Sequence, residues 1–267
     1  MSTYAALVEY RELFRNLFRR DLHAKYRGSA LGVVWTIANP VLLMAIYLLV
    51  FSVVWKAQFA SGDHYALFLL AGLAPWTFFA TSLQAATRSM LDNANLIRKT
   101  RFPRQLVPLS VVGAHLVSFA VMMVLLLVVN FVVLSRVRGT EWLAIPLAVL
   151  FVGLVAGLAL AVASLNVIFR DVEFIVAAVL LPWFFLTPVL YPLTGAPGSL
   201  AEHQKIVDLL HWGNPIAPGI VAIRDALFYG VVPTWGDTLY LACACVAALA
   251  LGAYVFTRVD DEIAIEV

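Results

Sequence analysis

Charged residues are scarce in this sequence. Of its 267 residues only 13% are Asp, Glu, Lys or Arg, against roughly 25% in ordinary soluble domains, and 63% are hydrophobic. The mean hydropathy is +0.91. A water-soluble fold of this length could not hide so much apolar surface. The composition therefore excludes a soluble domain and predicts an all-α integral membrane protein, because a helix satisfies its own backbone hydrogen bonds in lipid.

Catalytic and metal-binding motifs are absent as well. There is no G-x-x-x-x-G-K-[ST] phosphate loop, so the chain should not hydrolyse ATP by itself, and there is no H-E-x-x-H or paired-cysteine ligand set. Cys243 and Cys245 would point about 200° apart around a helix and are interpreted as packing residues. His115 has no acidic partner nearby in sequence and is interpreted as a hydrogen-bonded core residue. We predict no catalytic residue, metal or cofactor in this chain, which makes a membrane enzyme or scaffold the weakest alternative.

Acidic residues are missing from the apolar runs themselves. Only Glu173 and Asp237 come close, each just before a run. Carriers driven by protons or sodium keep carboxylates or histidines at membrane depth, although each costs about 2.5–3.5 kcal/mol or more. The energy for any transport should therefore come from outside the bilayer, and the chain then needs a cytoplasmic contact for a partner.

Long apolar runs fill most of the sequence, and six of them are long enough to cross about 30 Å of hydrocarbon. The fifth is short and ends in TPVLYP, where Pro188 and Pro192 cannot donate helical hydrogen bonds. A Gly- and Pro-rich segment, 192–233, then precedes the sixth and predicts external re-entrant helices. The predicted spans form a bundle over 31–257 within a single domain, 1–267: Leu31–Trp55, Ala66–Thr87, Leu106–Leu134, Trp142–Phe169, Phe174–Tyr191 and Leu239–Thr257.

The positive charges predict the orientation. Thirteen of the 18 Lys and Arg residues fall in the N-terminal segment and in alternate connections, which predicts that both termini, including the tail 258–267, are cytoplasmic. Within 4–28, apolar and aromatic residues recur on one helical face and basic residues on the other, as in helices that lie on a membrane surface. A solvated anchor with no further role is the alternative.

The connection between the second and third runs, RSMLDNANLIRKTRFPRQ, is the larger of two candidate cytoplasmic contacts. Asp92, Asn93 and Asn95 favour the start of a short helix, which would present Leu96 and Ile97 within a basic rim. A docking helix and an ordinary basic loop explain this pattern equally well. The shorter connection NVIFRDVEF, with Arg170, Asp171 and Glu173, offers a second contact.

Five motifs in order resemble the membrane subunit of type-2 ABC exporters, in the polysaccharide-export branch: RRDLHAKYRGSALGVVW, NANLIRKTRFPR, NVIFRDVEF, TPVLYP and WGNPIAPGIVAIRDALFYG. The resemblance implies a permease half that forms a homodimer in the bacterial cell (inner) membrane. It also implies two copies of a separate ATP-binding subunit that carries ATP and Mg, and no nucleic-acid partner. The implied substrate is a lipid-linked glycan of the O-antigen, teichoic acid or capsule type. Export of a drug or lipid by the same architecture is the alternative.

The resemblance also assigns roles to residues. It implies an exit cap at Asn214 and Pro215, and it favours the docking role for the first connection. The implied basic collar, where substrate enters, consists of Arg19, Arg20, Lys25 and Arg27. The implied contacts to the ATP-binding subunit are Asn93, Asn95, Leu96, Ile97, Arg98, Lys99, Arg101, Phe102, Pro103, Arg170 and Asp171.

Aromatic residues form two groups that a sliding saccharide could contact. Tyr47 and Phe51 share one face of the first run with Met44 and Trp55, and the fifth run carries Trp183, Phe184 and Phe185. Because the resemblance implies that these two runs line the path, we predict that the aromatics contact the glycan, with packing or lipid contact as the alternative. Gly153 and Gly157 permit close helix approach, which we expect within one bundle and not between copies.

Overall fold

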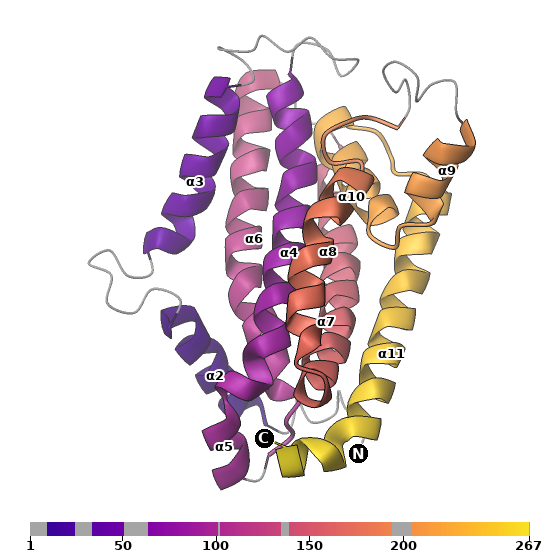
Figure 1. The fold of residues 1–267 in the computed structure, drawn as a ribbon. Helices are drawn as coiled ribbons and strands as arrows, with labels where there is room; N and C mark the ends of the chain where they lie inside the picture. The colour runs from indigo at the N-terminus through magenta and orange to yellow at the C-terminus, as the bar shows by residue number, and fades with distance from the viewer. Residues whose placement is uncertain are drawn as a thin grey trace.

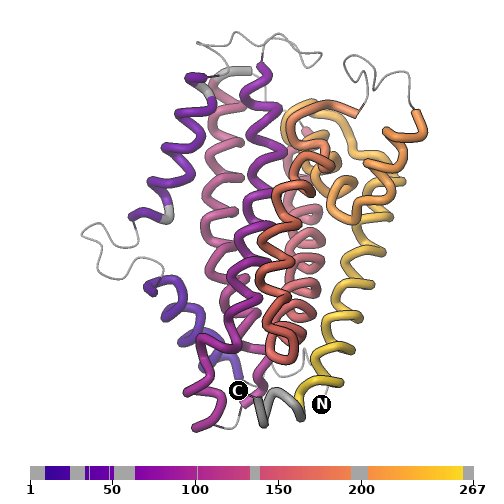
Figure 2. Tube along the Cα trace, in the orientation of Figure 1, coloured from indigo at the N-terminus to yellow at the C-terminus, as the bar shows by residue number. Residues whose placement is uncertain are grey.

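A computed structural model describes residues 10–24, 34–50, 64–100, 102–134, 139–193 and 204–266 (Figure 2). Within these ranges all regular elements are helical and there are no strands. The elements run side by side along one axis, with the short helix α5 (Ala94–Lys99) at one end and α9 (Gln204–Trp212) and α10 (Ala217–Arg224) near the other (Figure 1). The all-helical prediction is confirmed for the described residues.

Four helices in the described part of the chain are long and apolar enough to cross a membrane. They are α4 (Tyr65–Asp92), α6 (Leu106–Leu134), α7 (Ala144–Ile168, with the one-turn η3, Glu141–Leu143, before it) and α11 (Trp235–Glu266). Each coincides with a predicted span, and α6 has the predicted bounds. Over its most apolar window α4 is 83% buried, so it is the central helix of the bundle.

The helices α3 (Trp35–Leu48) and α8 (Asp171–Leu186) occupy the first and fifth predicted spans but contain only 14 and 16 residues. Residues 31–33 and 51–55 of the first prediction lie outside the described residues. Helix α8 ends at Leu186 because Thr187, which precedes Pro188, adopts an extended backbone (φ −96°, ψ 136°). Neither helix reaches spanning length by itself, so the count of six spans stays a prediction.

The segment between α8 and α11 folds into two helical parts. The first is α9, and the second is α10 continued by η5 (Asp225–Tyr229); the two parts are bent by 93° relative to one another. Gly230 ends the pair in the left-handed region (φ 65°), which favours glycine. The start of α11 anchors α9: the carboxylate of Asp237 lies 2.6 Å from Nε2 of His211, and the hydroxyl of Tyr240 donates to the carbonyl of Trp212 at 2.8 Å. This geometry fits either a broken span or a re-entrant segment.

Helix α2 (Arg11–Ala24) packs on α6 near α5 (Figure 1). Leu17 is buried, and the rings of Phe14 and Phe18 face Gly113 of α6, where a Cβ would lie 3.2 Å from the Phe18 ring. The hydroxyl of Ser110 on α6 donates to the carboxylate of Asp21 at 2.6 Å. Part of the apolar face that was predicted to contact lipid therefore contacts protein.

The closest helix pair is α7 with α11. A methyl group on Gly157 would overlap the backbone of Ala248, and one on Gly252 would overlap the carbonyl of Gly157. A methyl group on Gly153 would overlap the sulfur of Cys245, which is buried in the same interface. The prediction that Gly153 and Gly157 serve packing within one bundle is confirmed.

We expect Gly157→Leu to lower the melting temperature of the purified protein by several degrees, because overpacking costs about 1–3 kcal/mol and a backbone neighbour has little room to move. Oligomeric state should change less than stability. Val149→Leu, on the exposed face of the same helix, is the matched control. Thermal unfolding in detergent and light scattering measure the two effects, and a stable monomer from Gly157→Leu alone would contradict the assignment.

Candidate functional site

The α4–α5 corner is the first predicted contact for a partner. Asn93 occupies the position before α5, but its side chain makes no cap bond there; it donates back to the carbonyl of Ser89 at 2.8 Å. Asp92 is the last residue of α4, and Asn95 lies inside α5. The predictions of Asp92 and Asn95 as helix caps are therefore wrong. The α4–α5 corner is held instead by the hydrogen bond from Asn93 to the carbonyl of Ser89 in the last turn of α4.

The apolar residues of α5 do not both face outward. Ile97 is only 6% exposed and packs with Met90, Val107 and Phe256, whereas Leu96 is half-buried. The prediction that Leu96 and Ile97 both project toward a partner is wrong for Ile97, which is a core residue. Periodicity could not show this, because the covering helices are distant in sequence.

The remaining predicted contacts on this connection form an accessible rim. Asn95, Arg98 and Lys99 are exposed on α5, while Phe102 and Pro103 are half-buried after it. Arg101 lies outside the described residues. Arg104 ties this connection to α11 through an ion pair with Asp260 at 3.0 Å.

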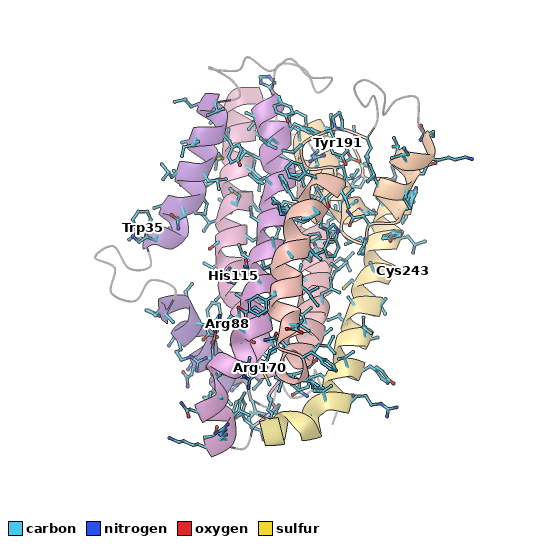
Figure 3. All side chains as sticks on the ribbon, viewed as in Figure 1. Trp35, Arg88, His115, Arg170, Tyr191 and Cys243 are labelled. Carbon is cyan, nitrogen blue, oxygen red and sulfur yellow. The ribbon has the colours of Figure 1, made fainter. Side chains whose placement is uncertain are left out.

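The turn between α7 and α8 is the second predicted contact. Arg170 and Asp171 are exposed there, at the same end of the bundle as α5 (Figures 1 and 3). Arg88 of α4 forms a 2.9 Å ion pair with Glu173, whose amide donates to the side-chain oxygen of Asn166 at 3.0 Å. Sequence reasoning missed Arg88 and Asn166. The Arg88–Glu173 ion pair and the Asn166 hydrogen bond link the two predicted contacts into one face. We name it the α5 face, and it consists of α5, the α7–α8 turn and the Arg88–Glu173 pair.

Trp183 and Asn214, predicted for different roles, are bonded to one another. The indole N–H donates to the side-chain oxygen of Asn214 at 3.0 Å, and the Asn214 amide donates to the hydroxyl of Thr187 at 2.9 Å. Asn214 also accepts from the amide of Ile216, at the start of α10. Asn214 thus joins the end of α8 to the bent segment, while Pro215 beside it is half-buried.

The predicted aromatic path is only partly accessible. The rings of Trp183 and Phe184 pack on α4, against Phe79 at 5.2 Å and Trp76 at 5.5 Å respectively. Phe185 is 57% exposed. Tyr47 is half-buried against the core, and Phe51 and Trp55 lie outside the described residues. Trp183 and Phe184 are thus half-buried against α4, and contact of the α8 aromatics with the glycan stays a prediction.

Arg224 is a buried cation that the sequence did not mark as functional. It is 2% exposed, and its guanidinium donates to the carbonyls of Pro188 and Val189 at 2.7 and 2.9 Å while lying 3.9 Å from the Phe68 ring centre. A methyl group on Gly72 would overlap this guanidinium, so the close approach requires glycine. Arg224 holds the turn after α8 to the bent segment and to α4.

The predicted basic collar is described only at Arg19 and Arg20, which are exposed on α2; Lys25 and Arg27 lie outside the described residues. Arg20 pairs with Asp21 at 2.7 Å. A pocket of about 550 Å³ opens beside them, between α2, α4 and α6. Its lining includes Arg88 and His115.

A family model described as ABC-2 type transporter matches residues 12–228. The chain belongs to the ABC-2 type transporter family. The predicted resemblance is thereby confirmed. As a member of this family, the chain is the membrane component of an ABC transporter and crosses the membrane more than once. Membership also implies an ATP-binding subunit as its partner.

The chain is also similar to curated members of polysaccharide-export systems. It is 34% identical to the O-antigen export system permease protein RfbA of Myxococcus xanthus over 262 residues, 97% of this chain and 96% of that protein. It is 35% identical to the protein of the same name from Klebsiella pneumoniae, over 80% of this chain and 79% of that one. The polysialic acid transport protein KpsM of Escherichia coli is 23% identical over 92% of both chains.

Proposed function

We propose that this chain is the permease half of an ATP-driven exporter that moves a lipid-linked polysaccharide from the cytoplasmic side of the bacterial inner membrane. The observation that carries the proposal is the similarity to an O-antigen export permease at 34% identity over 97% of the chain. A drug pocket would be an enclosed apolar cavity. The pocket beside α2 carries Arg20, Asp21, Arg88 and Asp92, whereas a pocket of about 570 Å³ between α6 and α7 is lined mainly by apolar residues, so the choice of a polysaccharide rests on the relatives and not on the pockets.

We propose six spans, with α3 and α8 as the first and fifth and the α9–α10 segment re-entrant on the outer side. The charge distribution supports this orientation, because the α5 face holds an excess of basic residues. Helix α2 and the last turns of α11 lie at that same end in Figure 1, which supports cytoplasmic termini. Helix α2 would then lie at the inner membrane surface, with Arg19 and Arg20 toward lipid phosphates.

We propose that the α5 face binds the separate ATP-binding subunit, which would carry ATP and Mg. The exposed residues of α5, the half-buried Leu96 and the exposed Arg170 and Asp171 are on this face. Arg88 near the end of α4 pairs with Glu173 near the start of α8, so a movement of α5 that shifts the end of α4 would be transmitted to α8 through this ion pair. Two copies of each subunit would assemble.

We propose a homodimer in which α8 lies at the boundary between the copies. Only Val176 and Leu180 of α8 are buried in the described structure, which makes it the least covered apolar helix beside α4. Its large exposed apolar residues are Phe174, Ile175, Val179, Leu181, Phe185 and Leu186. Phe185 and Tyr47 remain our candidates for aromatic contact with the sugar, and Asn214 and Pro215 for the exit cap.

The test uses the purified complex in lipid. The isolated chain should show no ATP hydrolysis, because it has no phosphate loop. Together with its ATP-binding subunit it should hydrolyse ATP, and a lipid-linked glycan should stimulate turnover more than the same lipid without sugar. Turnover by the isolated, contaminant-free chain would contradict the permease assignment, and equal stimulation by the bare lipid would contradict the glycan.

A further inference from the structure

The accessible surface of α4 differs from that of the other long helices. Its accessible residues in the central part lie at three- and four-residue intervals, so they share one face. Ala80 and Ala85 are half-buried on this face, and the polar residues on it are Thr77, which is half-buried, and the exposed Thr81, Gln84 and Arg88. We name these four polar residues the α4 stripe. On the other long helices large apolar residues are exposed at mid-helix positions, for example Val124 and Val128 on α6, Val149 on α7, and Val246 and Leu251 on α11.

An exposed polar stripe in the middle of an apolar span is not a lipid-facing surface. Polar groups at membrane depth are expensive in hydrocarbon and face the protein interior or water. Helix α4 contacts both α3 and α8, and in Figure 1 α6 is drawn between α3 and α4. Packing of Trp76 against Phe184 closes the α8 side, and a pocket of about 220 Å³ that includes Asn39 and Thr77 opens on the α3 side.

The α4 stripe continues toward the α5 end of the bundle. His115 of α6 lines both the 220 Å³ pocket and the 550 Å³ pocket beside α2, so the two pockets adjoin. Figure 3 shows His115 and Arg88 on the same side of the bundle, with Arg88 nearer to α5. Thr81 lines the first pocket and Arg88 the second. Polar groups therefore follow one another from the α2 surface to the middle of the bundle.

The chemistry of the α4 stripe suits weak contact with hydroxyl groups. The hydroxyl of Thr81 donates to the carbonyl of Thr77 at 2.7 Å, and that of Thr77 donates to the carbonyl of Ala74 at 3.0 Å. Their protons are thus engaged within the helix, and the oxygens are left as acceptors. Gln84 adds an amide that both donates and accepts. Passage requires contacts weak enough to release the substrate, and such neutral groups meet that requirement.

The same surface does not suit a polyanion. Helix α4 has no charged residue between Tyr65 and Thr87, and neither has the described α3 nor α8 beyond Glu173. A chain with a charge on each sugar would meet Arg88 at the α5 end but no counter-charge beside Thr77, Thr81 and Gln84, at a high electrostatic cost in low dielectric.

We infer that an uncharged, hydroxyl-rich saccharide crosses the membrane along the α4 stripe, which it enters from the pocket at Arg88 and His115. This inference rests on the proposed function and specifies its substrate class.

The first experiment measures whether water reaches the α4 stripe. Cys243 and Cys245 are replaced by Ala in the complex, and single cysteines are introduced as Thr81→Cys and Gln84→Cys, with Val128→Cys and Val246→Cys as exposed apolar controls. The probe is 2-sulfonatoethyl methanethiosulfonate, which reacts with the thiolate and so needs water around the sulfur. We expect labelling at 81 and 84 to be at least about tenfold faster than at 128 and 246, because thiols in lipid stay protonated. Equal or slower labelling at 81 and 84 would overturn the inference.

The second experiment measures glycan movement. Thr81→Val combined with Gln84→Met keeps side-chain size and removes the polar groups. Export of a neutral glycan per ATP hydrolysed should fall several-fold. Thr87→Val is the matched control, since its hydroxyl makes the same 2.7 Å bond to the carbonyl four residues earlier but is buried away from the α4 stripe. The control should export like wild type.

Two other results would count against the inference. Wild-type export by the double variant, or equal export of a neutral glycan and a polyanionic glycan on the same lipid carrier, would overturn the assigned substrate class. Failure of the wild-type complex to export any glycan would instead refute the proposed function and, with it, the saccharide. In that case the labelling contrast still decides whether the α4 stripe is a water-filled path.

Discussion

Leu96→Asp should abolish association with the ATP-binding subunit while leaving insertion and folding of this chain intact. Leu96 is half-buried on α5, at the face that we propose for the partner. A carboxylate that is buried without a counter-charge at an interface costs several kcal/mol, enough to lose the complex. The measurement is co-purification of the tagged partner with this chain, at matched amounts of inserted protein.

Two variants make this result specific. Lys99→Ala removes an exposed charge at the rim and should change affinity much less. Ile97→Asp is not a clean test, because Ile97 packs in the core against Met90 and Phe256 and the substitution should destabilise the chain itself. Equal losses from Leu96→Asp and Lys99→Ala would identify the connection as an ordinary basic loop.

Arg224→Met should be the most destabilising single substitution in the outer part of the molecule. It leaves the carbonyls of Pro188 and Val189 without their donors, and a hydrogen bond to a charged group contributes about 1.5–3 kcal/mol. The turn after α8 should then separate from α10, so we expect both a large drop in melting temperature and loss of export. Thermal unfolding in lipid and surface glycan measure the two effects.

The comparison variants separate the role of the guanidinium from that of charge alone. Arg224→Lys keeps the charge but lacks the planar fork that reaches two carbonyls, so it should give an intermediate loss. Lys205→Met, which removes an exposed cation from α9, should have no effect. If Arg224→Met is as stable and as active as Lys205→Met, the buried contact is not structurally important.

The long helices could be predicted because membrane thickness fixes how long an apolar run must be. The predicted and observed bounds agree at Leu106 and Leu134, where charged or turn-forming residues flank the run. The predicted fifth span ran to Tyr191, whereas α8 ends at Leu186, because Thr187 precedes Pro188 and adopts an extended backbone. The bend between α9 and α10 was harder to place, because it depends on Asn214 and Asp237 finding partners in other elements.

The candidate site was less predictable, because a helical face says nothing about which neighbour covers it. Ile97 and Trp183 looked accessible by spacing, yet Phe256 covers one and Asn214 engages the other. Thr81 and Gln84 lie within an apolar run and belong to no motif. The role that we propose for them depends on the burial of most of the other residues of α4, which no local pattern reveals.

The most direct test of the proposed function is surface glycan in bacteria that lack their own export permease but still make the lipid-linked glycan and the cognate ATP-binding subunit. Expression of this chain should restore surface glycan, and restoration should disappear when the ATP-binding subunit is inactive or when Leu96→Asp prevents its binding. Glycan that stays inside the cell despite normal amounts of both subunits, or surface glycan that does not depend on ATP hydrolysis, would contradict a role as an ATP-driven polysaccharide permease.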